Sequence, residues 1–369
     1  MRKTYFPIIF ILLSQFLFTG ISMSQENHKE KKIRYQTDTV GFSSRASQMD
    51  EFMRRLLREQ IGNIESSLSE AGIDNSTTWK AAICPHDDYT YVGYLYPALL
   101  TNIKAKTIIL FGVSHKAKQF GLENQIIFDS FSHWQMPYGE VPVSGLRNEI
   151  INKLSNGIYQ VNDSAQASEH STEAIIPFLQ YFNKDVQIIS ILVPYMPFER
   201  MNEISTILAG AITEVMKKNK LAWGEDYAVI ISTDAVHYGD RDWGGKNFAY
   251  YGSDSAGYNQ AVGHEMEIIN NCLTGNILEQ KVKKFVDYTV KEDNYLDYKW
   301  TWCGRYSVPF GLLTVLNMQN YSGVVLNGVL VKYATSIDHP HIEVKDIGMG
   351  ITAPANLNHW VGYAAIGYR

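Results

Sequence analysis

The chain has few cysteines and no marked excess of charge of either sign. Three cysteines in 369 residues are too few for a disulfide scaffold. The 33 Lys and Arg residues against 38 Asp and Glu give a formal net charge of -5, so no basic surface for nucleic acid or an anionic membrane is expected. At 45% hydrophobic and 19% charged residues, the composition is that of a globular protein and not of a disordered one.

Several common catalytic signatures are also missing. The sequence has no Gly-x-Gly-x-x-Gly after a predicted strand and no Walker-type phosphate loop. It has neither the Gly-x-Ser-x-Gly turn that carries the nucleophilic serine of α/β-hydrolases nor the His-Glu-x-x-His pair of zinc proteases. Any enzymatic function must therefore depend on another arrangement of residues.

The N-terminus has the pattern of a secretory signal peptide. Arg2 and Lys3 precede a short apolar run over residues 5–18, and Ser22 and Ser24 stand where an export peptidase requires small residues. The alternative, a membrane anchor, is disfavoured because a span needs about 20 apolar residues. We expect a signal peptide over residues 1–24, a protein exported to the periplasm or the cell exterior, and no membrane anchor after cleavage.

The rest of the chain reads as an α/β protein. Residues 25–49 are polar and lack apolar periodicity, which predicts an N-terminal tail, with the first helix capped by Asp50. Short apolar strands and amphipathic helices then alternate as far as the C-terminus. This alternation predicts one domain over residues 50–369, with a mainly parallel central sheet covered by helices.

Three histidines follow predicted strands directly. His86 comes after Ala-Ala-Ile-Cys-Pro, His115 after Ile-Ile-Leu-Phe-Gly-Val-Ser, and His237 after Ile-Ile-Ser-Thr-Asp-Ala-Val. The carboxyl ends of strands in such sheets meet at the crevice where ligands bind. A single histidine there is more often a loop or core residue, but three alike indicate a shared metal or acid–base site.

Cys303 is a fourth candidate, since it lies in a turn shortly before a predicted helix. The helix N-terminus and Arg305 would favour the thiolate, and a thiolate beside two imidazoles suits a first-row transition metal. The alternative is that Cys303 is a buried structural cysteine, and we interpret Cys84 and Cys272 in this way. The sequence leaves open whether those two cysteines form a disulfide after export.

Acidic residues and one further histidine stand close to these positions. They could orient a ligand histidine or carry a proton, but acidic residues in helix first turns and loops are commonly caps and turn formers. The residues of this polar group are Asp87, Asp88, Glu169, His170, Glu173 and Asp234.

Taken together, these segments resemble the Memo family, also called protein B of the AmmeMemoRadiSam system. The resemblance covers roughly residues 79–369. It lies in residues 85–93 (Pro-His-Asp-Asp-Tyr-Thr-Tyr-Val-Gly), 112–115 (Gly-Val-Ser-His), 169–173 (Glu-His-Ser-Thr-Glu), 232–239 (Ser-Thr-Asp-Ala-Val-His-Tyr-Gly), 303–305 (Cys-Gly-Arg) and 361–364 (Val-Gly-Tyr-Ala).

The resemblance implies a fold shared with class III extradiol ring-cleaving dioxygenases, in which two histidines and a carboxylate hold iron. In Memo-like proteins a cysteine takes the place of the carboxylate. By this resemblance His86, His115 and Cys303 are metal ligands, and His237 matches the acid–base histidine of the dioxygenases.

The implied function is that of a redox metalloprotein or dioxygenase-like oxidoreductase that uses iron or copper on a small-molecule substrate. A protein that holds a metal or binds a peptide in the same crevice, without catalysis, remains the alternative, because one fold hosts different functions. Asp87 and Asp88 stand where the family usually has Ala-Gly, which adds charge beside the metal. The signal peptide also departs from a usually intracellular family, so we expect this chain to act apart from the partners of that system.

The export signal makes the first testable prediction. Mass spectrometry of protein made in its native host should show a mature N-terminus near Gln25, because Ser22 and Ser24 mark the cleavage site. An intact Met1 in the cytosolic fraction would contradict it.

Overall fold

Four short apolar strands form the centre of the main sheet in the computed structural model. They are parallel and lie side by side in the order β2 (Ala81–Cys84), β9 (Tyr227–Ser232), β3 (Thr107–Val113) and β8 (Gln187–Val193). Every residue in them except Gln187 is buried. Continuous apolar strands of this kind are typical of parallel sheets that are covered on both faces.

Antiparallel strands extend this parallel centre on both sides. Beyond β2 lie β13 (His359–Tyr368), β12 (Asn327–Thr335) and β11 (Gly275–Asn276), and β10 (His237–Gly239) also pairs with β13. Beyond β8 lie β4 (Ile126–Phe128), which pairs antiparallel to it, and β7 (Tyr159–Val161). The predicted α/β fold is confirmed, and the sheet is mixed, with its parallel part at the centre.

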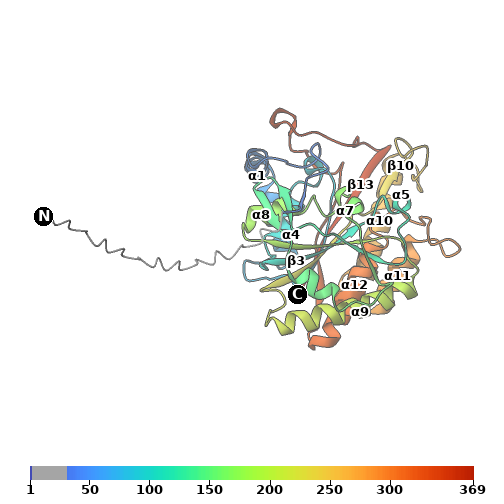
Figure 1. Ribbon diagram of the computed structural model, residues 1–369. Helices are drawn as coiled ribbons and strands as arrows, with labels where there is room; N and C mark the ends of the chain where they lie inside the picture. The colour runs from blue at the N-terminus through green and yellow to red at the C-terminus, as the bar shows by residue number, and fades with distance from the viewer. Residues whose placement is uncertain (2–30) are drawn as a thin grey trace. The chain divides into compact units, whose positions relative to one another are not determined.

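Helices cover both faces of this sheet, as Figure 1 shows. Alternate residues of β3 point to opposite faces: Ile109 and Phe111 lie in one core, and Ile108 and Leu110 lie in the other. The first core contains α9 (Phe198–Lys218), α10 (Ser255–Ile268), α11 (Glu279–Thr289) and α12 (Ser307–Ser322). The second contains α1 (Ala46–Glu59), α4 (Leu95–Leu100) and α8 (Ile176–Phe182).

The remaining elements are short. A separate three-stranded sheet joins β1 (Ile33–Arg34), β5 (His133–Met136) and β6 (Gly139–Pro142). The other helices are α2 (Ile61–Glu70), α3 (Tyr89–Val92), α5 (Ala117–Phe120), α6 (Leu146–Ile151), α7 (Asp163–Ala167), a π-helix (Ile269–Leu273) and a 3₁₀ helix (Lys345–Ile347). No helix among the described residues is both long and apolar enough to span a membrane.

The structure describes Met1 and residues 31–369, and Lys32–Arg369 form one compact unit. The predicted signal peptide and the first part of the expected tail lie outside the described residues. From Lys32 onward the structure differs from the expected tail, because β1 pairs with β5 and Phe42 is buried. The first helix also begins at Ala46, before Asp50, since the Gln48 side chain accepts a hydrogen bond from the Arg45 backbone N–H (3.1 Å).

A buried ion pair holds this N-terminal segment. The Arg34 guanidinium donates to the Glu173 carboxylate, and both side chains are completely buried. Glu173 also accepts hydrogen bonds from the backbone N–H groups of Thr37 (2.8 Å) and Asp38 (2.7 Å). These contacts are polar and involve single residues, so they leave no apolar periodicity in the sequence.

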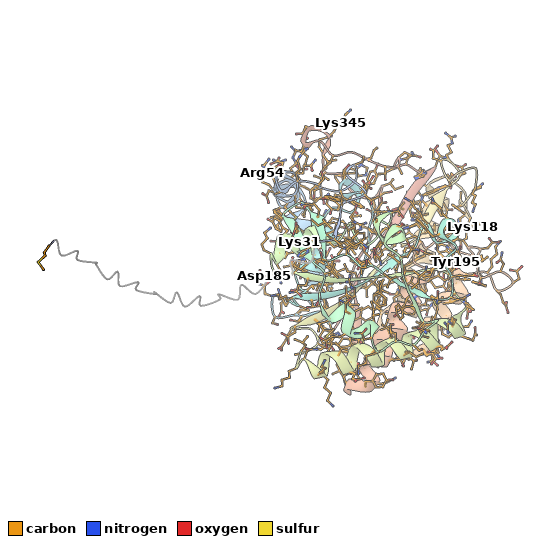
Figure 2. All side chains as sticks on the ribbon, in the orientation of Figure 1. Lys31, Arg54, Lys118, Asp185, Tyr195 and Lys345 are labelled. Carbon is orange, nitrogen blue, oxygen red and sulfur yellow. The ribbon has the colours of Figure 1, made fainter. Side chains whose placement is uncertain are left out.

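The buried pair predicts a large loss of stability on Glu173→Gln. Removing one partner leaves the Arg34 charge uncompensated in the interior, which typically costs about 3–5 kcal/mol. Thermal and denaturant unfolding should show this loss. Arg54, a surface residue labelled in Figure 2, pairs with Glu51, and Arg54→Gln should leave the melting temperature unchanged. Equal effects of the two substitutions would contradict the assigned role of Glu173.

Candidate metal centre

The carboxyl ends of the parallel strands β2 and β3, which lie on either side of β9, place two of the candidate ligands at one edge of the sheet. His86 follows β2, His115 follows β3, and Cys303 precedes α12. One ligand atom from each of these three residues lies within 4.8 Å of the other two. Cys303 Sγ is 3.4 Å from His86 Nε2.

The hydrogen bonds of His86 fix which ring nitrogen carries the proton. Ser232 Oγ donates its only hydrogen to the Ser171 carbonyl, so it must accept from His86 Nδ1, which is 2.8 Å away. The lone pair of the ring is therefore on Nε2, the nitrogen that faces Cys303. Burial lowers the pKa of His86 well below its usual value, which keeps this ring neutral.

Glu169 orients His115 in the same way. Its carboxylate accepts hydrogen bonds from His115 Nδ1 (2.8 Å), from the His115 backbone N–H (2.8 Å) and from the Ser171 backbone N–H (2.9 Å). Burial by itself raises the pKa of Glu169, but the His115 and His170 rings and these N–H donors outweigh it and hold the pKa well below its usual value. An ionised acceptor at Nδ1 leaves the lone pair of His115 on Nε2.

The Cys303 thiol is buried, and its surroundings differ from the sequence expectation. The Asp234 backbone N–H donates to Sγ (3.0 Å), yet burial, together with the Asp234 charge, raises the pKa of this thiol well above its usual value. Arg305 does not face the thiol, since its guanidinium stacks on the Tyr298 ring (3.5 Å). A cation bound at Sγ would displace the proton.

This donor set fits a transition metal. Two imidazole lone pairs converge with one sulfur, His86 and Cys303 being buried and His115 exposed, and both histidines have their other nitrogen hydrogen-bonded to an orienting partner. That arrangement of ligand and supporting partner is usual at metal sites.

His237 lies beside the three candidate ligands. Its ligand atom lies within 4.8 Å of those of Asp234 and Cys303, and its Nε2 is buried without a hydrogen-bond partner. Burial lowers the pKa of His237 to about 3, so the ring is neutral at physiological pH. A fourth ligand and an acid–base group are both compatible with this position.

The polar residues predicted around the site have different placements. Asp234 Oδ1 accepts from the His86 backbone N–H (2.8 Å), and the His170 ring stacks on His115 with 4.7 Å between centroids. Asp87 accepts a hydrogen bond from the Tyr363 hydroxyl (2.6 Å), and Asp88 from the Thr352 backbone N–H (2.6 Å). Glu173 lies away from the cavity lining and binds Arg34 instead.

A cavity of about 260 Å³ opens beside these residues. Trp243 and His359 are among the lining residues that the sequence did not indicate, and each has a buried ring nitrogen without a hydrogen-bond partner. His359 is 2% exposed and reaches the cavity because β13 pairs with β10, a contact between residues far apart in the chain. Locally, the sequence shows only a single histidine that precedes an apolar segment near the C-terminus.

A wider groove of about 1250 Å³ meets the site from another direction at His115. Lys118 and Tyr195, labelled in Figure 2, both line it. The cysteines outside the site, Cys84 and Cys272, are free and buried, so the disulfide left open above is not formed.

Comparison with known proteins identifies the family. The family model described as Memo-like protein matches residues 46–350. The chain belongs to the Memo-like family. The match begins at the first residue of α1 and includes every candidate ligand described above.

Relatives that carry the name MEMO1 family protein occur in several archaea. One from Thermococcus kodakarensis is 32% identical over 182 residues, which is 47% of this chain and 57% of the relative. One from Pyrococcus abyssi is 32% identical over 188 residues (50% and 60%), and one from Methanothermobacter thermautotrophicus is 29% identical over 167 residues (44% and 56%). The matches thus span a little over half the length of these Memo-like relatives.

The buried ionisable groups predict how the stability of the metal-free protein depends on pH. Burial raises the pKa of Asp234 and Glu265 to about 7, so between pH 4.5 and 7 the folded state binds more protons and stability decreases as pH rises. Burial lowers the pKa of His170 to about 4 and of His237 to about 3, so below pH 6.5 the unfolded state binds more protons at these residues.

Unfolding free energies of chelator-treated protein should therefore decrease from pH 7 to pH 8, because the folded protein loses its remaining extra protons from these carboxyl groups and because the cysteines of the unfolded chain begin to ionise while the buried thiols do not. Glu265→Gln should reduce this decrease, because it removes one of the responsible groups. An unchanged decrease in the Glu265→Gln variant would show that the Glu265 carboxyl group is already ionised in the folded protein.

Proposed function

We propose that this Memo-like protein is an exported redox metalloprotein that binds iron or copper through His86, His115 and Cys303. The observation that carries the proposal is the convergence of two oriented imidazole lone pairs with a buried sulfur. Imidazole nitrogen suits iron and copper, and thiolate sulfur favours soft ions such as Cu(I).

A bound redox metal would supply one-electron chemistry and the activation of O₂ or of a coordinated substrate. The chain's own residues would orient the ligands and handle protons. Ser232 and Glu169 hold the two imidazoles in the required tautomers, and the unpaired Nε2 of His237 can accept a proton from a substrate hydroxyl within the cavity.

The size of the cavity supports a small-molecule substrate. A volume of about 260 Å³ accommodates a molecule with a single ring and is small for a peptide segment. The groove of about 1250 Å³ is lined by only one of the candidate ligands, His115. We therefore favour an oxidoreductase of the dioxygenase type over a peptide-binding protein, and a protein that only holds its metal is distinguished by the absence of turnover.

Metal titrations of ligand variants test this proposal. With Fe(II) or Cu(I) added anaerobically to the mature chain, His86→Ala and His115→Ala should each remove most of the binding. Cys303→Ser should also weaken it strongly, because a hydroxyl is a poor replacement for a thiolate. Cys272→Ser is the matched control, since Cys272 is likewise buried and free but lies outside the site, and it should bind normally.

His237→Ala separates proton transfer from ligation. This variant should keep metal affinity close to that of the unmodified protein and lose any O₂ uptake with small phenolic substrates. If it loses as much affinity as His86→Ala, His237 is a ligand. If protein purified from its native host contains zinc as its only metal and takes up no O₂, the redox assignment is wrong.

A further inference from the structure

Three buried ring nitrogens at one end of the cavity have no hydrogen-bond partner. They are His237 Nε2, His359 Nε2 and Trp243 Nε1, and all three residues line the cavity. A buried polar group left unpaired costs about 1–3 kcal/mol, and folded proteins retain few of them. Three in one cavity indicate that a ligand supplies the missing partners.

The proton on His359 can be located from its surroundings. Nδ1 lies 3.0 Å from the Arg241 carbonyl oxygen, which can only accept, so Nδ1 carries the hydrogen. His359 Nε2 is then an acceptor that requires an O–H or N–H donor. The ring stacks on Trp243 with 3.8 Å between centroids and an interplanar angle of 9°, which fixes the direction of this acceptor.

Strand pairing sets His359 next to His237. In the register of β10 and β13, His237 is opposite Val361 and Gly239 is opposite His359, so the two histidines are diagonal neighbours on one face. Gly239 makes this close approach possible, because a Cβ there would lie 2.0 Å from the Asn358 carbonyl oxygen. Its φ of +131° is also one that residues with side chains rarely adopt.

The charged residues around the cavity are all acidic. No lysine or arginine occurs among the described residues that line it, so an anionic group would find no basic side chain there. The acidic lining residues are Asp38, Asp87, Asp88 and Asp234. An anionic ligand would be removed from water in this cavity with no basic side chain to pair with it, a cost that a neutral ligand avoids.

We propose that His359 is a substrate-binding residue, and that this cavity takes a small molecule with hydroxyl or amine donors and no anionic group. The assignment of this ligand as a substrate rests on the proposed function. The binding itself uses His237, His359 and Trp243 and requires no metal.

Calorimetric titration of the full mature chain, first chelator-treated and then metal-loaded, tests the proposal. Dopamine and 4-methylcatechol should bind, and 3-(3,4-dihydroxyphenyl)propionate, which has the same ring with a carboxylate, should bind at least about tenfold more weakly. His359→Phe keeps a ring against Trp243 but removes the acceptor, so it should weaken dopamine binding about tenfold, the equivalent of 1.4 kcal/mol. Its metal affinity should not change.

His339→Phe is the matched control, because His339 Nε2 is also buried and unpaired but lies outside this cavity. It should bind dopamine normally. Three outcomes would each overturn the proposal. The first is that the carboxylate binds as tightly as dopamine or more tightly, and the second is that a folded His359→Phe binds dopamine normally. The third is that no probe binds in either metal state. If His359→Phe does not fold, the comparison of the three probes on the unmodified chain still decides the charge preference. If the metal titrations of the ligand variants show that His86, His115 and Cys303 bind no metal, the probe binding measured here is still a valid test, because it requires no metal.

Discussion

The ionised carboxylate of Glu169 is the group on which the rest of the site depends. It is buried, yet it stays charged because His115 and two backbone N–H groups donate to it. Its own backbone carbonyl accepts a hydrogen bond from Arg34 (2.5 Å), and Arg34 is balanced in turn by Glu173. The segment of residues 169–173 therefore connects the N-terminal strand to the orientation of a candidate metal ligand.

This connection explains why residues 32–45 belong to the folded unit. Removing charge from water is costly, so a buried arginine needs a partner and several acceptors in fixed positions. Arg34 has them in Glu173 and in the carbonyls of Gln166 and Glu169. The N-terminal segment is thus a structural support for the site, although it supplies none of the three candidate ligands.

Local sequence signals predicted the centre of the sheet and the positions of the strand-end histidines. His86 and His115 each follow a buried apolar strand, and the carboxyl ends of such strands meet at one edge, so their proximity follows from fold class alone. Cys303 was a candidate from its turn before a predicted helix, and the family resemblance assigned it as a ligand. The buried pair of Arg34 and Glu173 joins residues 139 positions apart in the chain, and the direction in which the flanking strands pair leaves no local pattern, so neither could be predicted.

His359 shows the same limit from the functional side. Its position depends on the pairing of β13 with β10 and on the fold of the loop that carries Trp243. Neither the strand pairing nor the loop conformation leaves a repeating pattern of apolar and polar residues in the sequence. The sequence therefore indicates where reacting groups gather, whereas the residues that select a ligand become visible only in three dimensions.

The placement of the thiols has a consequence for the environment in which this protein can work. The sequence contains three cysteines, and all three lie in the interior. The exterior consequently has no sulfhydryl group through which molecules could become crosslinked or be modified by an oxidant. Oxidation of thiols would therefore be confined to sulfur inside the fold in an oxidising and in a reducing compartment alike.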